Sequence, residues 1–204
     1  MKNENTDLNY GVIFDMDGVL IDSAQPHFQS WRLLAEENGC EMPESLFWET
    51  FGKTNNQILP LIFKRVMSEN ELRKFSDRKE ALYRDIIRGK VTPLPGLIKM
   101  IGDLGKMGIK FAIGSSGPRL NVELAIKELG FEKALTGYTC SEDVTRGKPH
   151  PEVFLKAAEK LQIPPKRCLV FEDSLHGIEA ARRAGMKCIA ITTTNHKESV
   201  KFEV

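Results

Sequence analysis

The feature that most constrains this chain is an apolar run that ends abruptly in two carboxylates. Within the stretch Tyr10–Ser23, Val12–Phe14 is followed by Asp15, Asp17 and a glycine, Gly18. An apolar run with no polar face is typical of a buried strand in a parallel sheet. Because Asp and Gly are poor strand formers, the acids mark the carboxyl end of that strand, where open α/β sheets place their ligands.

The two acids also suggest a cation. Carboxylates that lie this close repel each other unless a cation or a shared proton lies between them. Mg²⁺ is the natural candidate, because it prefers oxygen ligands and often bridges carboxylates to a phosphate. The alternative is a solvated turn at the strand end, in which Asp15 acts only as a cap, since one Asp-x-Asp match is weak evidence alone.

Composition argues against several classes of partner. Charged residues make up 28% and apolar residues 41% of the 204 residues, and the net charge is +1. This balance gives no reason to expect nucleic acid or an anionic membrane as a partner, and no apolar stretch approaches the length of a membrane span. The cysteines form no Cys-x-x-Cys pair, and the first nine residues lack the apolar core of a signal peptide. We therefore expect a cytoplasmic protein with reduced thiols. We also expect a monomer or weak dimer.

Residues 24–90 have helical periodicity and no strand signal. The first apolar repeat at helical spacing is followed by Gly39, which fits the end of a helix. Ser68 and Glu71 have the spacing of a capping box, which predicts the start of a longer helix that ends near Gly89. Two shorter amphipathic helices are expected over Pro43–Phe51 and Asn56–Val66.

After residue 90, strands and helices alternate. The expected strands are Ile109–Gly114, Thr136–Cys140, Cys168–Phe171 and Lys187–Thr192. The expected helices are Leu97–Met107, Pro118–Leu129, Pro151–Leu161 and Leu175–Ala184. Repeated alternation predicts an α/β fold with a doubly wound parallel sheet and right-handed crossovers. We expect residues 1–23 and 91–204 to form this core, with residues 24–90 inserted as an all-helical cap domain.

Two later strand ends offer groups for an anion. Ser115 and Ser116 follow a strand and precede a helix, where hydroxyls and backbone N–H groups suit phosphate; the alternative is a plain helix cap. Lys148 lies in a proline-rich loop before another helix, where it would serve as a point charge for phosphate. Its alternative is a solvated loop lysine.

A further strand end offers acids again. Glu172 and Asp173 follow a buried run and supply oxygen ligands for a divalent cation, although they would also suit the first turn of the next helix. Together, the four strand ends predict a phosphate site more specifically than any one of them does. Carboxylates at two of them and a serine and a lysine at the others would surround a phosphoryl group with complementary charge, as phosphoryl transfer requires.

In these motifs the chain resembles the haloacid dehalogenase-like superfamily, and most closely its β-phosphoglucomutase/phosphatase branch. The motifs are Asp15-Met16-Asp17-Gly18-Val19, then Ser115, then Lys148, then Glu172-Asp173, with Leu94-Pro95-Gly96 at the expected cap exit. The similarity extends over nearly the whole chain, from Gly11 to Thr192. It implies a Rossmann-like core with a helical cap that closes over the site and chooses the substrate.

The resemblance also implies a role for each motif residue. Asp15 would be the nucleophile that forms an aspartyl-phosphate, and Asp17 would act as general acid and then as general base. Ser115 would donate to a phosphoryl oxygen, and Lys148 would neutralise the charge shared by phosphate and Asp15. Mg²⁺ would be held by the Asp15 carboxylate, the Asp17 backbone carbonyl and Asp173, with Glu172 as further support.

We predict an Mg²⁺-dependent phosphatase acting on a small phosphate monoester, such as a sugar phosphate. One alternative is a β-phosphoglucomutase-like mutase, which uses the same Asp15 but tends to need an arginine in the polar loop of the cap. Here Asn55 stands at that place with Lys53 nearby, so we expect this loop to contact substrate without favouring a mutase. The other alternative is a non-catalytic phosphometabolite-binding protein, which would have no need for both Asp15 and Asp17.

Overall fold

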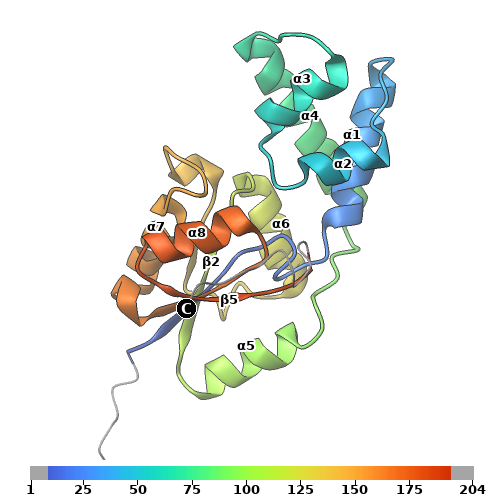
Figure 1. Cartoon of the computed structure of the whole chain (residues 1–204). Coiled ribbons are helices and arrows are strands. Elements are labelled where there is room, and N and C mark those ends of the chain that lie inside the picture. The colour runs from blue at the N-terminus through green and yellow to red at the C-terminus, as the bar shows by residue number, and fades with distance from the viewer. Residues whose placement is uncertain (1–8, 194–204) are drawn as a thin grey trace, which may run out of the picture. The chain divides into compact units, whose positions relative to one another are not determined.

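The structure is a computed structural model that describes residues 9–193. The chain divides into two compact units (Figure 1). The core unit comprises Met1–Asp22 and Thr92–Val204, and the helical unit comprises Ser23–Val91.

The core unit is built on a five-stranded parallel sheet in the order β3-β2-β1-β4-β5. Its strands are β1 (Gly11–Phe14), β2 (Lys110–Gly114), β3 (Gly137–Thr139), β4 (Cys168–Glu172) and β5 (Lys187–Ala190). The first strand of the chain is therefore the central one, and its four residues are all buried. This arrangement confirms the predicted doubly wound α/β core.

Two helices cover one face of the sheet. Ile13, Ala112 and Val170 share a buried apolar cluster with α7 (Glu152–Leu161) and α8 (Leu175–Arg183). Because side chains alternate along a strand, the neighbouring residues must point to the other face. The apolar faces of α7 and α8 thus pack on one side of a sheet whose two sides are both apolar.

The opposite face is aromatic at its centre. The Phe14 ring stacks on Phe171 with centroids 5.1 Å apart and meets Phe111 edge to face at 5.9 Å. Figure 1 shows α5 (Leu97–Lys106) on the other side of the sheet from α7 and α8, and α6 (Arg119–Leu129) completes the α-helices of this unit. Two 3₁₀ turns, Ser141–Asp143 and Pro165–Arg167, precede α7 and β4.

The helical unit consists of α1 (Ala24–Glu37), α2 (Glu44–Thr50), α3 (Asn55–Phe63) and α4 (Glu69–Ile87). The predicted capping box is present, since the Glu71 carboxylate accepts from the Ser68 N–H at 3.0 Å and Ser68 Oγ accepts from the Glu71 N–H at 3.4 Å. The predicted extension of α3 to Val66 is wrong. The helix ends at Phe63 because Lys64 adopts a left-handed conformation with φ of 51°.

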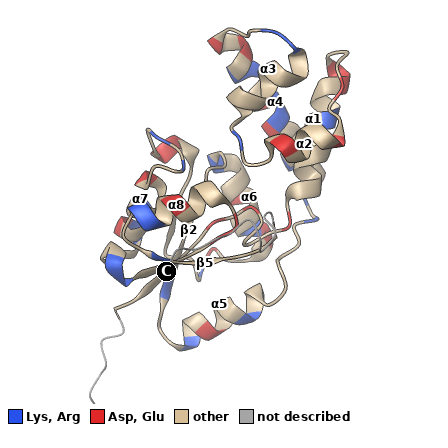
Figure 2. Ribbon diagram, viewed as in Figure 1, with Lys and Arg blue, Asp and Glu red and all other residues tan. Residues whose placement is uncertain are grey.

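Residues of both charges are mixed along the helices. Figure 2 shows Lys and Arg interspersed with Asp and Glu along the helices of both units, as a net charge of +1 suggests. Across residues 9–193, none of the helices combines the length and the apolar character that a membrane span requires.

One charged side chain lies inside the helical unit. Lys79 is 2% exposed, and its Nζ lies 2.9 Å from Glu80 Oε1 and 2.8 Å from His27 Nδ1. The ammonium also lies 5.2 Å from the centre of the Trp31 ring, and the His27 ring stacks on Tyr83 with centroids 4.0 Å apart. Because an ammonium only donates, His27 Nδ1 accepts this hydrogen bond. The charge is thus satisfied by a carboxylate, an imidazole and aromatic faces.

The surroundings of Glu80, including Lys79, change the pKa of its carboxyl group. Burial raises the pKa of Glu80, but the charge of Lys79, the nearby His27 and the hydrogen bonds from Asn55 and Lys79 together outweigh it and lower that pKa from 4.5 to about 2. A carboxyl group whose pKa is lowered on folding stabilises the folded state above its unfolded pKa, and this contribution is lost as the pH falls. At about 1.4 kcal/mol for each pKa unit, the shift corresponds to about 3 kcal/mol, lost between pH 4.5 and about 2.

We predict that Glu80→Gln lowers the melting temperature at pH 7 by roughly 6 °C or more, because Lys79 keeps its buried charge without a counter-ion. The difference from the wild type should shrink as the pH falls below 4.5, since Glu80 itself becomes neutral there. Thermal unfolding followed by circular dichroism from pH 7 to pH 3 measures both effects. Glu49→Gln, an exposed change of the same type in this unit, is the control. A pH-independent difference would contradict the prediction.

Candidate active site

The candidate site begins where β1 ends. The Asp15 N–H donates to the Phe171 carbonyl at 2.9 Å, so the β1–β4 pairing continues into Asp15, whose side chain is buried. The chain then turns at Gly18, which has φ of 74°, a conformation that favours glycine. A Cβ at Gly18 would lie 2.1 Å from Asp173 Oδ2, so this position needs glycine for space as well as for its backbone. The Thr193 hydroxyl donates to the Gly18 carbonyl at 2.6 Å.

Lys148 contacts one acid of the first motif, Asp15, and one acid of the last motif, Glu172. Its Nζ lies 2.5 Å from Asp15 Oδ1 and 2.7 Å from Glu172 Oε2, and its side chain is 7% exposed. The ammonium also lies 4.7 Å from the centre of the Phe154 ring of α7. The alternative of a solvated loop lysine is therefore wrong. Burial alone would lower the pKa of Lys148, but the charges of Asp15 and Glu172 outweigh it and raise that pKa.

Both carboxylate oxygens of Glu172 accept hydrogen bonds. Its Oε2 accepts from Lys148, while its Oε1 accepts from the Asp173 N–H at 3.1 Å and from the Ser174 N–H at 2.9 Å and Oγ at 2.8 Å. Only 1% of the residue is exposed. Glu172 therefore orients the ammonium and holds the turn that carries Asp173.

The acids form a cluster that fits a divalent cation. Asp15, Glu172 and Asp173 are buried, and each offers a carboxylate oxygen within 4.8 Å of the others. Burial and, after it, the nearby Glu172 carboxylate raise the pKa of Asp15 well above its ordinary value, although Lys148 opposes them. One lysine cannot balance three buried carboxylates, and a hard cation with a preference for oxygen would. The carboxylate of Asp17 is not part of this group.

Asp17 instead lies near the end of β2. A Cβ built on Gly117 would lie 3.8 Å from Asp17 Oδ2 and 3.2 Å from Ser115 Oγ, so both side chains gather around this glycine. Ser115 is buried and its Oγ accepts from the Gly117 N–H at 2.9 Å. Ser116 is exposed and has no such role in the turn.

The start of α6 differs from the predicted anion site. The Arg119 N–H donates to both carboxylate oxygens of Glu142 at 3.0 Å, so this donor is already taken by the protein itself. The Arg119 side chain bonds Asp143 Oδ1 at 2.7 Å, which ties the loop after β3 to the same helix end. A phosphate at this edge would therefore depend on Ser115 and the turn before the helix.

Lys53 and Asn55, the predicted substrate contacts, lie in the helical unit at the start of α3. Lys53 is exposed. Asn55 is half-buried, and its Nδ2 donates to Glu80 Oε1 at 2.8 Å, which links this loop to Lys79. Sequence reasoning missed Lys79, although a signal existed: it falls four residues after Phe75, on the apolar face of its helix.

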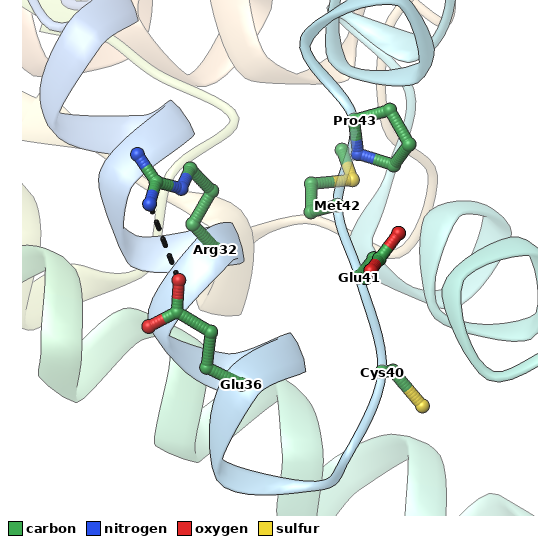
Figure 3. A pocket seen from close by; sticks show the side chains of 6 residues that line it. All are labelled: Arg32, Glu36, Cys40, Glu41, Met42 and Pro43. Atoms are coloured by element: carbon green, nitrogen blue, oxygen red, sulfur yellow. Dashed lines mark hydrogen bonds and ion pairs between the residues drawn. The ribbon is translucent and has the colours of Figure 1, made fainter.

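The helical unit also contains a pocket of about 260 Å³ beside the end of α1 (Figure 3). Its lining contains none of the predicted site residues and consists of Arg32, Glu36, Cys40, Glu41, Met42 and Pro43. The ion pair between Arg32 and Glu36 is more than half exposed on both sides, and such pairs contribute little. The candidate site is therefore the acid cluster of the core unit and not this pocket.

Comparisons with known proteins identify the family of the chain. The family model described as haloacid dehalogenase-like hydrolase matches residues 12–191. A phosphorylated carbohydrates phosphatase of Thermotoga maritima is 31% identical over 178 residues, which cover 87% of this chain and 82% of that protein. The chloroplastic 5-amino-6-(5-phospho-D-ribitylamino)uracil phosphatase of Arabidopsis thaliana is 34% identical over 90% of this chain. The match spans only half the length of that plant protein.

Among solved structures, a β-phosphoglucomutase from Clostridium difficile has a similar fold. Its TM-score is 0.76 at 25% sequence identity, with 93% of this chain and 94% of that chain covered. The sequence relatives are thus named phosphatases, and this structural neighbour is named a mutase.

Proposed function

The chain belongs to the haloacid dehalogenase-like hydrolase family and is a phosphoric monoester hydrolase, and we propose that it releases phosphate from a small metabolite, such as a sugar phosphate, through an aspartyl-phosphate. The observation that carries this proposal is the buried contact between Asp15 and Lys148, which keeps a carboxylate beside a fixed positive charge. The named phosphatases among its relatives support the choice of a phosphorylated small molecule.

In the proposed reaction, an Asp15 carboxylate oxygen attacks the phosphorus of the ester. A new P–O bond forms to Asp15, the bond to the ester oxygen breaks, and Asp17 gives a proton to that leaving oxygen. Water then attacks the phosphorus of the aspartyl-phosphate while Asp17 accepts a proton from it. The P–O bond to Asp15 breaks, so inorganic phosphate leaves and the Asp15 carboxylate is restored. Lys148 stabilises the negative charge near Asp15, and Ser115 donates to a phosphoryl oxygen.

The acid cluster fits Mg²⁺, which would be held by the carboxylates of Asp15 and Asp173 and the backbone carbonyl of Asp17, with Glu172 in support. When bound, the ion would neutralise phosphoryl oxygens and the nearby carboxylates. The protein contributes the buried site, in which charges interact more strongly than in water.

We predict that Asp15→Asn abolishes phosphate release and leaves the fold intact, because the amide cannot act as the nucleophile. Release is measured on a panel of phosphorylated sugars and on an aryl phosphate, with Mg²⁺ and with a chelator. Asp103→Asn, the same change at a partly exposed residue of α5 that pairs with surface lysines, is the matched control and should keep full activity.

Activity of Asp15→Asn above about one part in a thousand would contradict the nucleophilic role, judged against usual losses for catalytic groups. Full phosphate release in the presence of chelator would contradict the proposed requirement for Mg²⁺. Absence of release, with isomerisation once a hexose bisphosphate is added, would indicate the mutase.

A separate prediction concerns the polar loop of the helical unit. If Lys53 and Asn55 contact the distal end of the substrate, their alanine variants should change the ranking of kcat/KM among sugar phosphates by about tenfold and affect the aryl phosphate less. Lys74→Ala, an exposed change in the same unit, is the control. Equal losses on every ester would count against substrate contact by this loop.

A further inference from the structure

Gly177 lies in the first turn of α8, directly against the Glu172 side chain. A Cβ at Gly177 would lie 2.0 Å from both Cδ and Oε2 of Glu172. Gly102 in α5 is a contrasting case, because nothing lies within 4 Å of the Cβ position there. Both glycines lie within helices, where alanine is ordinarily the more favourable residue, so Gly177 requires a different explanation.

The Glu172 carboxylate has little freedom to move away. Its Oε2 is fixed by Lys148 at 2.7 Å, and its Oε1 is fixed by two backbone N–H groups and the Ser174 hydroxyl. The residue is 1% exposed, so water cannot replace the lost partners without opening the site. A clash that a surface glutamate would relieve by rotating is therefore costly here.

Gly177 also supports Glu172 through its backbone. The Gly177 N–H donates to Ser174 Oγ at 3.0 Å, and Ser174 Oγ donates to Glu172 Oε1 at 2.8 Å. The first turn of α8 thus provides both the space that the carboxylate fills and the hydroxyl that orients it.

We propose that Gly177 is a positioning residue that sets the place of the Glu172 carboxylate and, through it, of the Lys148 ammonium beside Asp15. The oxygen that a Cβ at this position would displace is Oε2, the one that Lys148 contacts. Glutamate at residue 172 and the absence of a side chain at residue 177 therefore form a coupled pair.

The first test compares Gly177→Ala with Gly102→Ala by thermal unfolding. Gly102→Ala should leave the melting temperature unchanged or raise it, whereas Gly177→Ala should lower it by about 4 °C or more, as overpacking a buried site does. A Gly177→Ala protein as stable as the Gly102→Ala control would overturn the proposal.

The second test identifies the partner of the clash. Glu172→Asp shortens the acid by one methylene, so adding Gly177→Ala to it should lower the melting temperature by less than half as much as in the wild type. An equal loss in both backgrounds would overturn the proposal, because the clash would then involve another group. If Gly177→Ala alone does not fold, the proposal requires that the double variant Glu172→Asp/Gly177→Ala does fold. A double variant that does not fold, although Glu172→Asp alone folds, would also overturn the proposal.

The third readout rests on the proposed function. Gly177→Ala should lose roughly a hundredfold in kcat on an aryl phosphate and show a smaller rise in melting temperature with millimolar Mg²⁺, while Gly102→Ala resembles the wild type. Inactivity of the wild type, or a wild type that does not respond to Mg²⁺, would refute the proposed function and leave the stability tests decisive for Gly177. An unchanged rate in Gly177→Ala would overturn the positioning role.

Discussion

The site depends on one ammonium group held between two buried carboxylates. Lys148 contacts Asp15 and Glu172 at 2.5 and 2.7 Å, and all three side chains are nearly inaccessible to water. Removing one member of such a group leaves a buried charge without compensation, which costs several kcal/mol. The three residues lie far apart in the sequence, so their contact requires the ends of β1 and β4 and the loop before α7 to be held in register.

The strand order supplies that register. The sheet order β3-β2-β1-β4-β5 places the first strand of the chain in the centre, with β2 and β4 on either side. Parallel pairing then brings the carboxyl ends of all three strands to one edge, where the strand order reverses and ligands bind in α/β sheets. Aromatic packing of Phe14 on Phe171 below this edge fixes the two acid-bearing strands against each other.

Much of this architecture could be predicted because the sequence signals are local. Apolar runs that end in Asp, Ser or Glu mark the strand ends, and the helices of the core unit begin and end within a residue or two of the expected positions. The contacts that each strand-end residue makes could not be predicted in the same way, because they involve residues distant in the sequence. The burial of Lys148 and the use of Glu142 as a cap for α6 depend on residues distant in sequence, and so does the need for glycine at residue 177.

The insertion of the helical unit is compatible with this register because the chain leaves and re-enters the core unit at one place. The Asp22 N–H donates to the Thr92 carbonyl at 3.3 Å, and the Leu94 N–H donates to the Leu20 carbonyl at 3.0 Å. These bonds join the two segments of the core unit on either side of the inserted Ser23–Val91. The helical unit holds its own polar group, in which Asn55 and Lys79 share Glu80. Residues of the helical unit can therefore differ without removing any of the contacts that hold Lys148 between Asp15 and Glu172 in the core unit.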